Sequence, residues 1–227
     1  MTITYHAEMI QGSEDWVKIR QGLMTASEMK FVITPTLKIA DNDQTRSHVY
    51  ELSGQRLTGF TEPTYIGDEM TRGMVDEPIA RQLYNDNFSP VTECGFITND
   101  DHGFTIGYSP DGLVGDDGLI EVKGRRQKFT VQSIVDGEVP KEHMLQIQTG
   151  LLVTGRKWCD YLSFTGGMPL LPIRVYPDEA VHEAIIKACT AFEAKIATVV
   201  NAYHERLLNE KWVMTERLVE ADGEIVL

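Results

Sequence analysis

The fold of this chain is decided by two neighbouring stretches, Tyr108-Ser109-Pro110-Asp111-Gly112 and Leu119-Ile120-Glu121-Val122-Lys123-Gly124. The first has the Pro-Asp-Gly composition of a tight turn, and the second has the apolar, β-branched composition of a buried strand. Because side chains alternate between the faces of a strand, Glu121 and Lys123 share one face while Val122 points to the other. The sequence therefore predicts a turn followed by a strand with an acid and a base on one face.

The charges on this strand need partners, because burying an unpaired charge is costly. If Asp111 folds back beside Glu121, two carboxylates and an ammonium converge, and a divalent cation would relieve the repulsion between the carboxylates. A plain β-hairpin with a solvated Glu-x-Lys face is the alternative and, judged from the spacing alone, the commoner outcome. The pattern by itself leaves both readings open.

The composition is that of an ordinary globular protein. The chain has 227 residues, of which 42% are hydrophobic and 24% are charged. This length is enough for one well-filled domain, and no linker or repeat divides it, so we expect a single domain over residues 1–227. No stretch approaches the run of about 18 apolar residues that a membrane span needs, and residues 1–8 lack the basic and apolar parts of a secretory signal.

The three cysteines, Cys94, Cys159 and Cys189, are odd in number and far apart in the sequence. This arrangement argues against a disulfide framework and against a cysteine-rich zinc or iron–sulfur site. A reducing cytoplasm is the compartment that such a chain suits.

The net charge of −13 argues against a nucleic-acid-binding surface spread over the whole protein. It leaves room for a local basic patch, and Arg125, Arg126 and Lys128 follow the Glu-x-Lys strand directly. These residues form either a phosphate-binding cluster or a solvated turn. Their position beside the strand favours the phosphate-binding cluster.

The remaining periodicity predicts alternating helices and strands. Helices are expected over residues 13–22, 26–33, 44–58, 67–84, 129–136, 141–154 and 178–208, and strands over 91–97, 104–108, 119–124, 158–164 and 170–176. The strand–helix–strand step at 117–164 predicts an α/β fold with a mixed central sheet flanked by helices.

A second anion-binding arrangement lies near the N-terminus. Arg20 ends one predicted helix, and Thr25 or Ser27 caps the next. A guanidinium beside a hydroxyl at a helix N-terminus is a sound phosphate receptor. Simple helix capping is the alternative and, from these residues alone, the commoner outcome.

Four motifs in this order carry a family resemblance. Ser109-Pro110-Asp111 with Glu121-Val122-Lys123 resembles the PD-(D/E)xK nuclease signature. Residues 16–28 resemble the N-terminal segment of the phage lambda exonuclease family, the YqaJ-like viral recombinases. Gly73-Met74-Val75-Asp76-Glu77 resembles its Gly-x-x-x-Glu helix, and Met144-Leu145-Gln146-Ile147-Gln148 resembles its glutamine-bearing helix. The resemblance covers about residues 13–155, and residues 156–227 carry no matching motif.

The resemblance implies a restriction-endonuclease-like core and a nuclease activity. Members of this family are Mg²⁺-dependent exonucleases that degrade the 5′ strand of double-stranded DNA processively and leave 3′ single-stranded overhangs. It further implies a ring-shaped homotrimer that binds DNA ends and works beside a single-strand annealing protein in phage recombination. The expected location is the cytoplasm of a bacterial host, from a phage or prophage gene.

The resemblance also implies a two-metal site with oxygen ligands. Asp111, Glu121 and the backbone carbonyl of Val122 would hold Mg²⁺, with Mn²⁺ as a substitute, and Glu77 would help to hold a second ion. From the residues alone, Glu77 is either a surface helix acid or a carboxylate aimed at the cleft.

Two further catalytic roles come from the same resemblance. Lys123 would contact the attacking water or the scissile phosphate, and a pKa lowered by burial near metal would suit it as a general base. Gln146 would orient the lysine or the water.

The family's DNA-binding positions map onto other residues of this chain. Arg20, Ser27 and Ser109 correspond to the pocket for the terminal 5′-phosphate. Met70 lies where the family places an apolar wedge that separates the strands, although a packing role is commoner for such a methionine. The cluster at residues 125–128 departs from the pattern, which in lambda exonuclease has a Cys-Pro pair after the Glu-x-Lys.

Three other functions compete with this reading. An endonuclease built on the same core would cut closed circular duplex. A nuclease of an RNA-guided system usually carries a four-cysteine iron–sulfur cluster, which three scattered cysteines cannot build. A non-catalytic DNA-end-binding protein would bind without Mg²⁺-dependent product, but the acids, the lysine and Gln146 are all present together.

Overall fold

The computed structural model describes residues 2–63 and 67–217. Its helices are α1 (Glu14–Arg20), the 3₁₀ helix η1 (Ala26–Phe31), α2 (Asp43–Thr58), α3 (Asp68–Asn87), α4 (Gln127–Asp136), α5 (Lys141–Thr154) and α6 (Glu179–Asn209). Its strands are β1 (Ile3–His6), β2 (Met24–Thr25), β3 (Val91–Thr92), β4 (Phe96–Asn99), β5 (Ile106–Tyr108), β6 (Gly112–Val114), β7 (Gly118–Gly124), β8 (Trp158–Phe164) and β9 (Pro172–Val175). None of the helices in these ranges has the length and hydrophobicity that crossing a bilayer requires.

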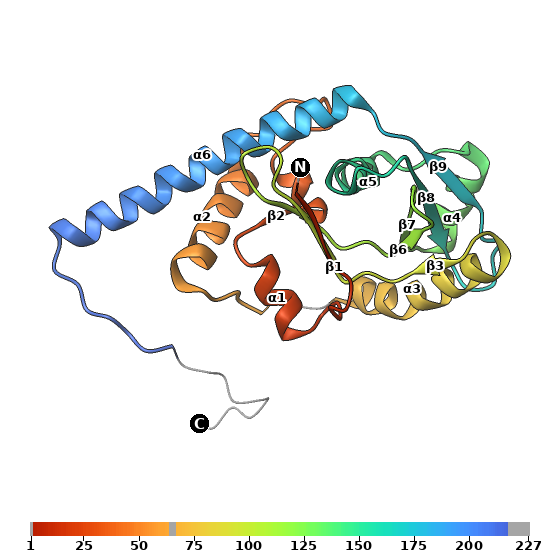
Figure 1. Cartoon of the computed structure of the whole chain (residues 1–227), viewed down its shortest axis with the longest axis horizontal. Helices are drawn as coiled ribbons and strands as arrows, with labels where there is room; N and C mark the ends of the chain where they lie inside the picture. Colours follow the sequence, from red (N-terminus) through yellow and green to blue (C-terminus); the bar gives the residue numbers. More distant parts are fainter. Residues whose placement is uncertain (1, 64–66, 218–227) are drawn as a thin grey trace.

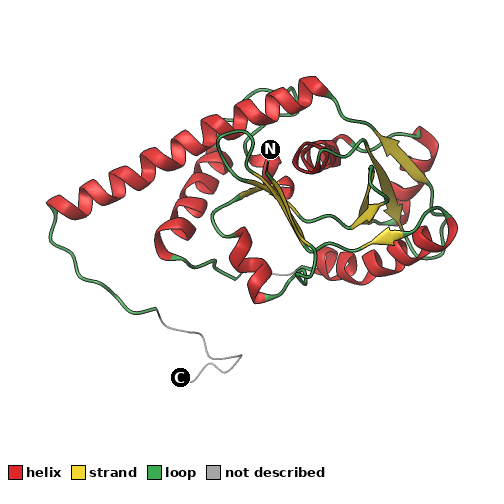
Figure 2. Cartoon of the chain, in the orientation of Figure 1, coloured by secondary structure: helices red, strands yellow, loops and turns green. Residues whose placement is uncertain are grey.

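The larger sheet has the strand order β3-β6-β7-β8-β9 and is mixed, as predicted. β7 pairs antiparallel with β6 and parallel with β8. A parallel pair needs a long crossover connection, and α4 and α5 supply it. Helices therefore lie on both sides of this sheet (Figure 2).

The two faces of β7 contact different helices, which explains why its sequence is apolar almost throughout. Ile120 and Val122 pack with Ala80 and Tyr84 of α3. Leu119 faces the opposite way, into the main core that includes α5. Strand alternation therefore places Glu121 on the α5 side of the sheet.

The smaller sheet, of order β1-β4-β5-β2, meets the larger one at the Pro-Asp-Gly turn. β5 belongs to the smaller sheet and β6 to the larger, and only residues 109–111 join them. The turn that the sequence singled out therefore lies at the junction of the two sheets (Figure 1).

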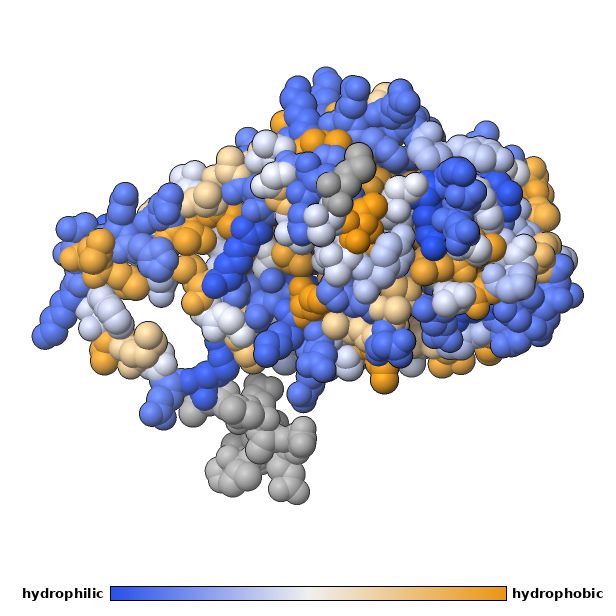
Figure 3. Space-filling view, in the orientation of Figure 1, coloured by the Kyte–Doolittle hydropathy of each residue, from blue (hydrophilic) through white to orange (hydrophobic). Residues whose placement is uncertain are grey.

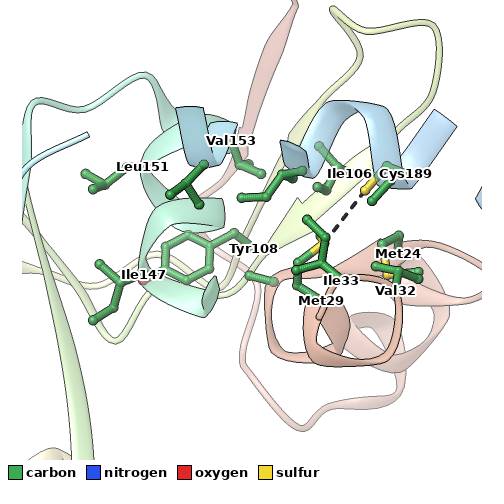
Figure 4. Packing of buried hydrophobic residues seen from close by; sticks show 14 of the residues in the cluster. Met24, Met29, Val32, Ile33, Ile106, Tyr108, Ile147, Leu151, Val153 and Cys189 are labelled. Carbon is green, nitrogen blue, oxygen red and sulfur yellow. Dashed lines mark hydrogen bonds between the residues drawn. The ribbon is translucent and has the colours of Figure 1, made fainter. Parts of the chain in front are cut away.

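The main core fills the space between α5, η1, β5 and α6 (Figure 4). Tyr108 lies beside Ile147 and Leu151 of α5 in this packing. A Cβ added at Gly150 would lie 2.7 Å from the Tyr108 ring, so the close approach of α5 to β5 requires glycine at this position.

The long helix α6 has two different halves. Its N-terminus is capped by the Asp178 carboxylate, which accepts hydrogen bonds from two backbone N–H groups of the first turn. Its buried residues run from Val181 to Ile196 and pack beside α2. The C-terminal half extends past the body of the molecule, and hydrophobic surface lies along this projecting end (Figures 1 and 3).

Several element predictions need correction. The strand predicted over 91–97 is two short strands in different sheets. The strand is interrupted around Gly95, where any Cβ would overlap the Met9 carbonyl. The helix predicted over 26–33 is a 3₁₀ helix that ends at Phe31. β1, β2 and β6 were not predicted, since each has four residues or fewer.

Candidate active site

Glu121 is fully buried on β7, and both of its carboxylate oxygens are hydrogen-bonded. Tyr108 donates its hydroxyl to one oxygen over 2.9 Å, and the Lys123 ammonium donates to the other over 2.6 Å. The acid and the base therefore share one face of the strand, as the alternation predicts. These two donors offset the cost of burying the carboxylate.

Asp111 folds back onto β7, which is one of the two arrangements that the sequence left open. Its carboxylate accepts a 2.6 Å hydrogen bond from the backbone N–H of Val122, and Arg81 of α3 donates to its backbone carbonyl over 2.8 Å. Burial raises the pKa of the Asp111 carboxyl well above its usual value, and the nearby charges of Glu121 and Glu77 raise it further. The two carboxylates of the motif are therefore close enough to repel.

Glu77 approaches this pair from α3. Arg81, one turn further along the helix, pairs with it over 2.9 Å. Burial raises the pKa of Glu77, and Glu121 adds to this rise while Arg81 opposes it. Of the two readings left open for Glu77, the structure therefore favours the carboxylate turned toward the cleft.

In the site without metal, the pKa of the Lys123 ammonium is raised. Burial alone would lower the pKa of Lys123, but the carboxylates of Glu121 and Asp111 outweigh it and raise the pKa overall. The expected lowering of the Lys123 pKa applies to a site that holds metal, so it stays a prediction. Lys123 is a cation and a hydrogen-bond donor here.

The donor chemistry of this site fits a hard divalent cation. Two carboxylates and a backbone carbonyl are oxygen donors, and the carboxylates of Glu121 and Glu77 lie close enough to Asp111 to raise its pKa beyond the effect of burial. Within the described ranges, no three His, Cys, Asp or Glu side chains surround a common point. Mg²⁺ suits such a site, because it is held by one or two carboxylates and keeps several waters.

A second polar cluster, around Arg20, adjoins the Pro-Asp-Gly turn. Arg20 donates to the hydroxyls of Ser109 over 3.0 Å and Thr25 over 3.3 Å, and its guanidinium lies 4.1 Å above the Trp16 ring. The indole N–H of Trp16 also donates to Ser109. Ser27 is exposed and contacts Thr25. The three residues predicted for a phosphate pocket are thus gathered at one place.

Two of the predicted site residues do not join these contacts. Gln146 is half-buried on α5, and in the described part of the chain its side chain forms no hydrogen bond to Lys123. Gln148 is the glutamine that is engaged, because its amide bonds the Tyr176 carbonyl and the Asp178 N–H. Met70 lies in the first turn of α3 and is 52% exposed.

The basic cluster after β7 is only partly solvated. Arg125 pairs with Glu142 over 3.1 Å and contacts the His143 ring. Both Arg125 and Lys128 lie against the ring of Phe129, at 4.5 and 4.7 Å.

Sequence reasoning missed three residues of the site: Trp16, Arg81 and Tyr108. Arg81 had a usable signal, since it lies four residues after Glu77 on a predicted helix. Tyr108 begins the quoted motif, but its hydrogen bond to Glu121 joins two different sheets. The spacing of residues in the sequence therefore could not predict it.

Comparison with known proteins identifies the family. The sequence profile of the YqaJ-like viral recombinase domain matches residues 15–157. The chain belongs to the YqaJ-like viral recombinase family. An alkaline exonuclease (LHK-Exo) from Laribacter hongkongensis is 32% identical, with a TM-score of 0.76 over 87% of this chain and 99% of that one.

Other solved structures extend this comparison. LHK-Exo in complex with dAMP matches with a TM-score of 0.75 at the same identity and coverage. A phage-related exonuclease from Haemophilus somnus 129PT shares the fold at 13% identity, with a TM-score of 0.57 over 80% of this chain and 96% of that one. No curated protein matches the sequence. This viral recombinase-like chain therefore has the nuclease fold that the PD-(D/E)xK signature predicted.

Proposed function

We propose that this protein is a divalent-metal-dependent exonuclease that degrades the 5′ strand of double-stranded DNA and leaves 3′ overhangs. Its family, and the alkaline exonuclease that it resembles at 32% identity, support a nuclease acting on DNA ends. That relative also forms a complex with dAMP, a deoxynucleoside monophosphate. Such a compound is what an exonuclease releases from DNA.

The observation that carries the proposal is the short link between the Arg20 cluster and the carboxylate site. Ser109, which contacts Arg20, and Asp111, which contacts β7, are separated by Pro110 alone. Two residues of extended chain span at most about 7 Å. A terminal 5′-phosphate held at Arg20 would therefore place the next phosphate of the strand beside the carboxylates, as removal of one end nucleotide requires.

The residues of the site have distinct roles in this mechanism. Lys123 carries three N–H donors, of which Glu121 takes one, so the others can donate to the scissile phosphate. Its positive charge would stabilise the charge that builds up on the phosphate in the transition state. Tyr108 fixes the orientation of Glu121, and Arg81 holds the turn that presents Asp111.

The metal completes the chemistry. Asp111, Glu121 and the Val122 carbonyl would hold Mg²⁺ or Mn²⁺, with Glu77 at a second ion. When bound, such ions neutralise phosphoryl oxygens and lower the pKa of a bound water. We assign activation of the water to the metal and charge neutralisation to the lysine, whose ammonium is positioned by its 2.6 Å ion pair with Glu121.

The assembly belongs to the same proposal. We infer a homotrimeric ring that encircles DNA and works with a single-strand annealing protein in phage recombination, inside a bacterial host. Exposed apolar side chains on α3 (Val75, Ile79 and Leu83) and Leu208 on the projecting half of α6 support contacts between subunits. An acidic exterior around a basic channel would fit the net charge of −13.

The test is digestion of linear duplex DNA with Mg²⁺, using 5′-phosphate ends, 5′-hydroxyl ends and a closed circle. We expect loss of the 5′ strand from phosphorylated linear DNA, an intact circle, and no product after the metal is chelated. Cleavage of the closed circle would instead identify the protein as an endonuclease. Binding of ends without any metal-dependent product would identify a non-catalytic end-binding protein.

A further inference from the structure

A cavity of about 430 Å³ adjoins the catalytic lysine and takes no part in the mechanism above. Arg72 of α3, Lys123 and the basic residues after it, and the first turns of α4 and α5 form its walls. Five of the lining side chains are Lys or Arg, and one is a carboxylate, Glu142. The cavity therefore has a strong positive charge inside a protein whose total charge is negative.

The cations of this cavity are not all consumed by internal ion pairs. Lys123 pairs with Glu121, and Arg125 pairs with Glu142. Among the residues that the structure describes, no carboxylate pairs with Arg72 or Lys128. The Phe129 ring holds Lys128 at the wall through a cation–π contact of 4.7 Å. Positioned cations without an acidic partner are suited to an anion from outside the chain.

Two helix N-termini add to this positive field. α4 begins at Gln127 and α5 at Lys141, and neither helix has a side-chain hydrogen bond at its N-cap. The cavity is lined by Lys128 and Phe129 from the first turn of α4 and by Glu142 and His143 from that of α5. Phe129 and His143 donate their backbone N–H groups to the Arg126 and Pro140 carbonyls, so among the described residues of the cavity wall the first-turn N–H groups of Lys128 and Glu142 are the ones available to phosphate oxygens.

The position of the cavity selects its ligand. Arg20 and Ser109 do not line it, and Lys123 belongs both to the carboxylate site and to the cavity wall. A strand with its terminal phosphate at Arg20 and its scissile phosphate at Lys123 can therefore continue directly into this basic cavity.

We propose that this cavity binds the backbone phosphate immediately 3′ of the scissile bond, so that the strand runs from Arg20 past Lys123 toward Arg72 and Lys128. The inference rests on the proposed exonuclease function. The shared chemistry is a nucleotide phosphate, which the uncut strand or the released mononucleotide could supply. We assign it to the strand, because the mononucleotide leaves with its own 5′-phosphate on the Arg20 side.

The test combines a double substitution with a neutral backbone linkage. Arg72→Ala/Lys128→Ala removes the two cations, and Lys38→Ala/Lys187→Ala removes two exposed cations that do not line the cavity. The DNA substrates carry one methylphosphonate either at the second linkage from the 5′ end or at the sixth. The measured quantity is the rate of release of the first nucleotide in a single turnover.

The neutral second linkage should slow the wild type and the remote control about tenfold, since it removes a charge-assisted contact. The Arg72/Lys128 variant should be slowed by a similar factor on ordinary DNA and show no further loss with the neutral linkage. A neutral sixth linkage should change nothing for any protein. Equal further losses in all three proteins at the second linkage would overturn the proposal.

Two other measurements keep the outcomes distinct. In metal-free buffer, the affinity for duplex DNA is measured at several salt concentrations. The slope of log affinity against log salt concentration should become shallower by about one for each cation removed at the cavity. An unchanged salt dependence in the Arg72/Lys128 variant overturns the inference, whether or not the wild type releases nucleotide. A wild type that releases no nucleotide contradicts the exonuclease proposal instead. If dAMP inhibits the wild type but not the Arg72/Lys128 variant, and the neutral linkage has no selective effect, the cavity is a product site and the strand path is wrong.

Discussion

The two faces of β7 are one residue apart in sequence and differ in almost every physical property. On one face, Glu121 and Lys123 form a 2.6 Å ion pair in contact with Tyr108. On the other, Ile120 and Val122 pack against α3 in an apolar cluster. The same seven-residue strand thus supplies the chemistry on one side and part of the stability on the other, so substitutions on the two faces should produce opposite patterns of loss.

The largest effect is expected from Glu121→Gln on the chemical face. The amide keeps an oxygen for Tyr108 or Lys123 but loses the charge that binds metal. We expect nuclease activity to fall by about a thousandfold, the size of loss seen when charge stabilisation of a transition state is removed. The melting temperature should change little in comparison. Digestion of linear duplex by the purified variant measures the effect, and activity within a few-fold of wild type would exclude Glu121 from the mechanism.

On the apolar face, Ile120→Ala should reverse this pattern. Ile120 is fully buried between β7 and α3, and truncating such a side chain costs about 2–5 kcal/mol through lost burial and the cavity left behind. Denaturant unfolding should show this loss, while the folded fraction keeps a rate within a few-fold of wild type. Val135→Ala is the matched control, because that side chain on α4 is 76% exposed and should cost almost nothing. A loss of activity without a loss of stability would erase the distinction between the faces.

The alternation of side chains in the sequence was enough to predict β7, because a two-residue period assigns each residue to one of its two faces. The same holds for α5 and β8, whose bounds match the predicted 141–154 and 158–164. The short strands β1, β2 and β6 were not predictable in this way. They exist because partners distant in sequence hold them, as β4 holds Ile3–His6 at residues 96–99.

The candidate site shows the same limit. The convergence of Asp111 and Glu121 followed from a turn and a strand that are adjacent in sequence. The pKa of Lys123 did not, because its direction depends on how many carboxylates lie within reach after folding. Gln146 and Gln148 are equally polar interruptions of an apolar helix, and only the packing of α6 shows that Gln148 is bound to its N-terminal segment.

Arg20→Ala tests whether the chemical face depends on the neighbouring phosphate pocket. Arg20 bridges the hydroxyls of Ser109 and Thr25, and burial lowers its pKa, so it needs an anion more than an exposed arginine does. We expect a drop of about tenfold to a hundredfold on 5′-phosphorylated ends, the value of a charge-assisted contact. Activity on 5′-hydroxyl ends should change much less. Equal losses on both ends would mean that Arg20 supports the fold and not the phosphate.

The smallest effect concerns a group beside the chemical face. Burial, together with the charges of Lys123 and Arg125, lowers the pKa of His143 to about 3. The unfolded chain binds this proton near pH 6.5, so it takes up more protons than the native state between about pH 6.5 and pH 3. Stability is therefore greatest above about pH 6.5 and falls as the pH is lowered through this window.

His143→Gln should remove this part of the acid sensitivity, because glutamine does not titrate and its oxygen can still accept a hydrogen bond from Arg125. Between pH 6.5 and pH 4.5, we expect the wild type to lose about 1–2 kcal/mol more unfolding free energy than the variant. Asp111 and Glu77 have raised pKa values and act in the opposite direction, but they are common to both proteins and cancel in the difference. Urea unfolding at the two pH values gives that difference. Parallel losses would mean that His143 is protonated in the folded protein and adds a further positive charge to the cavity beside Lys123.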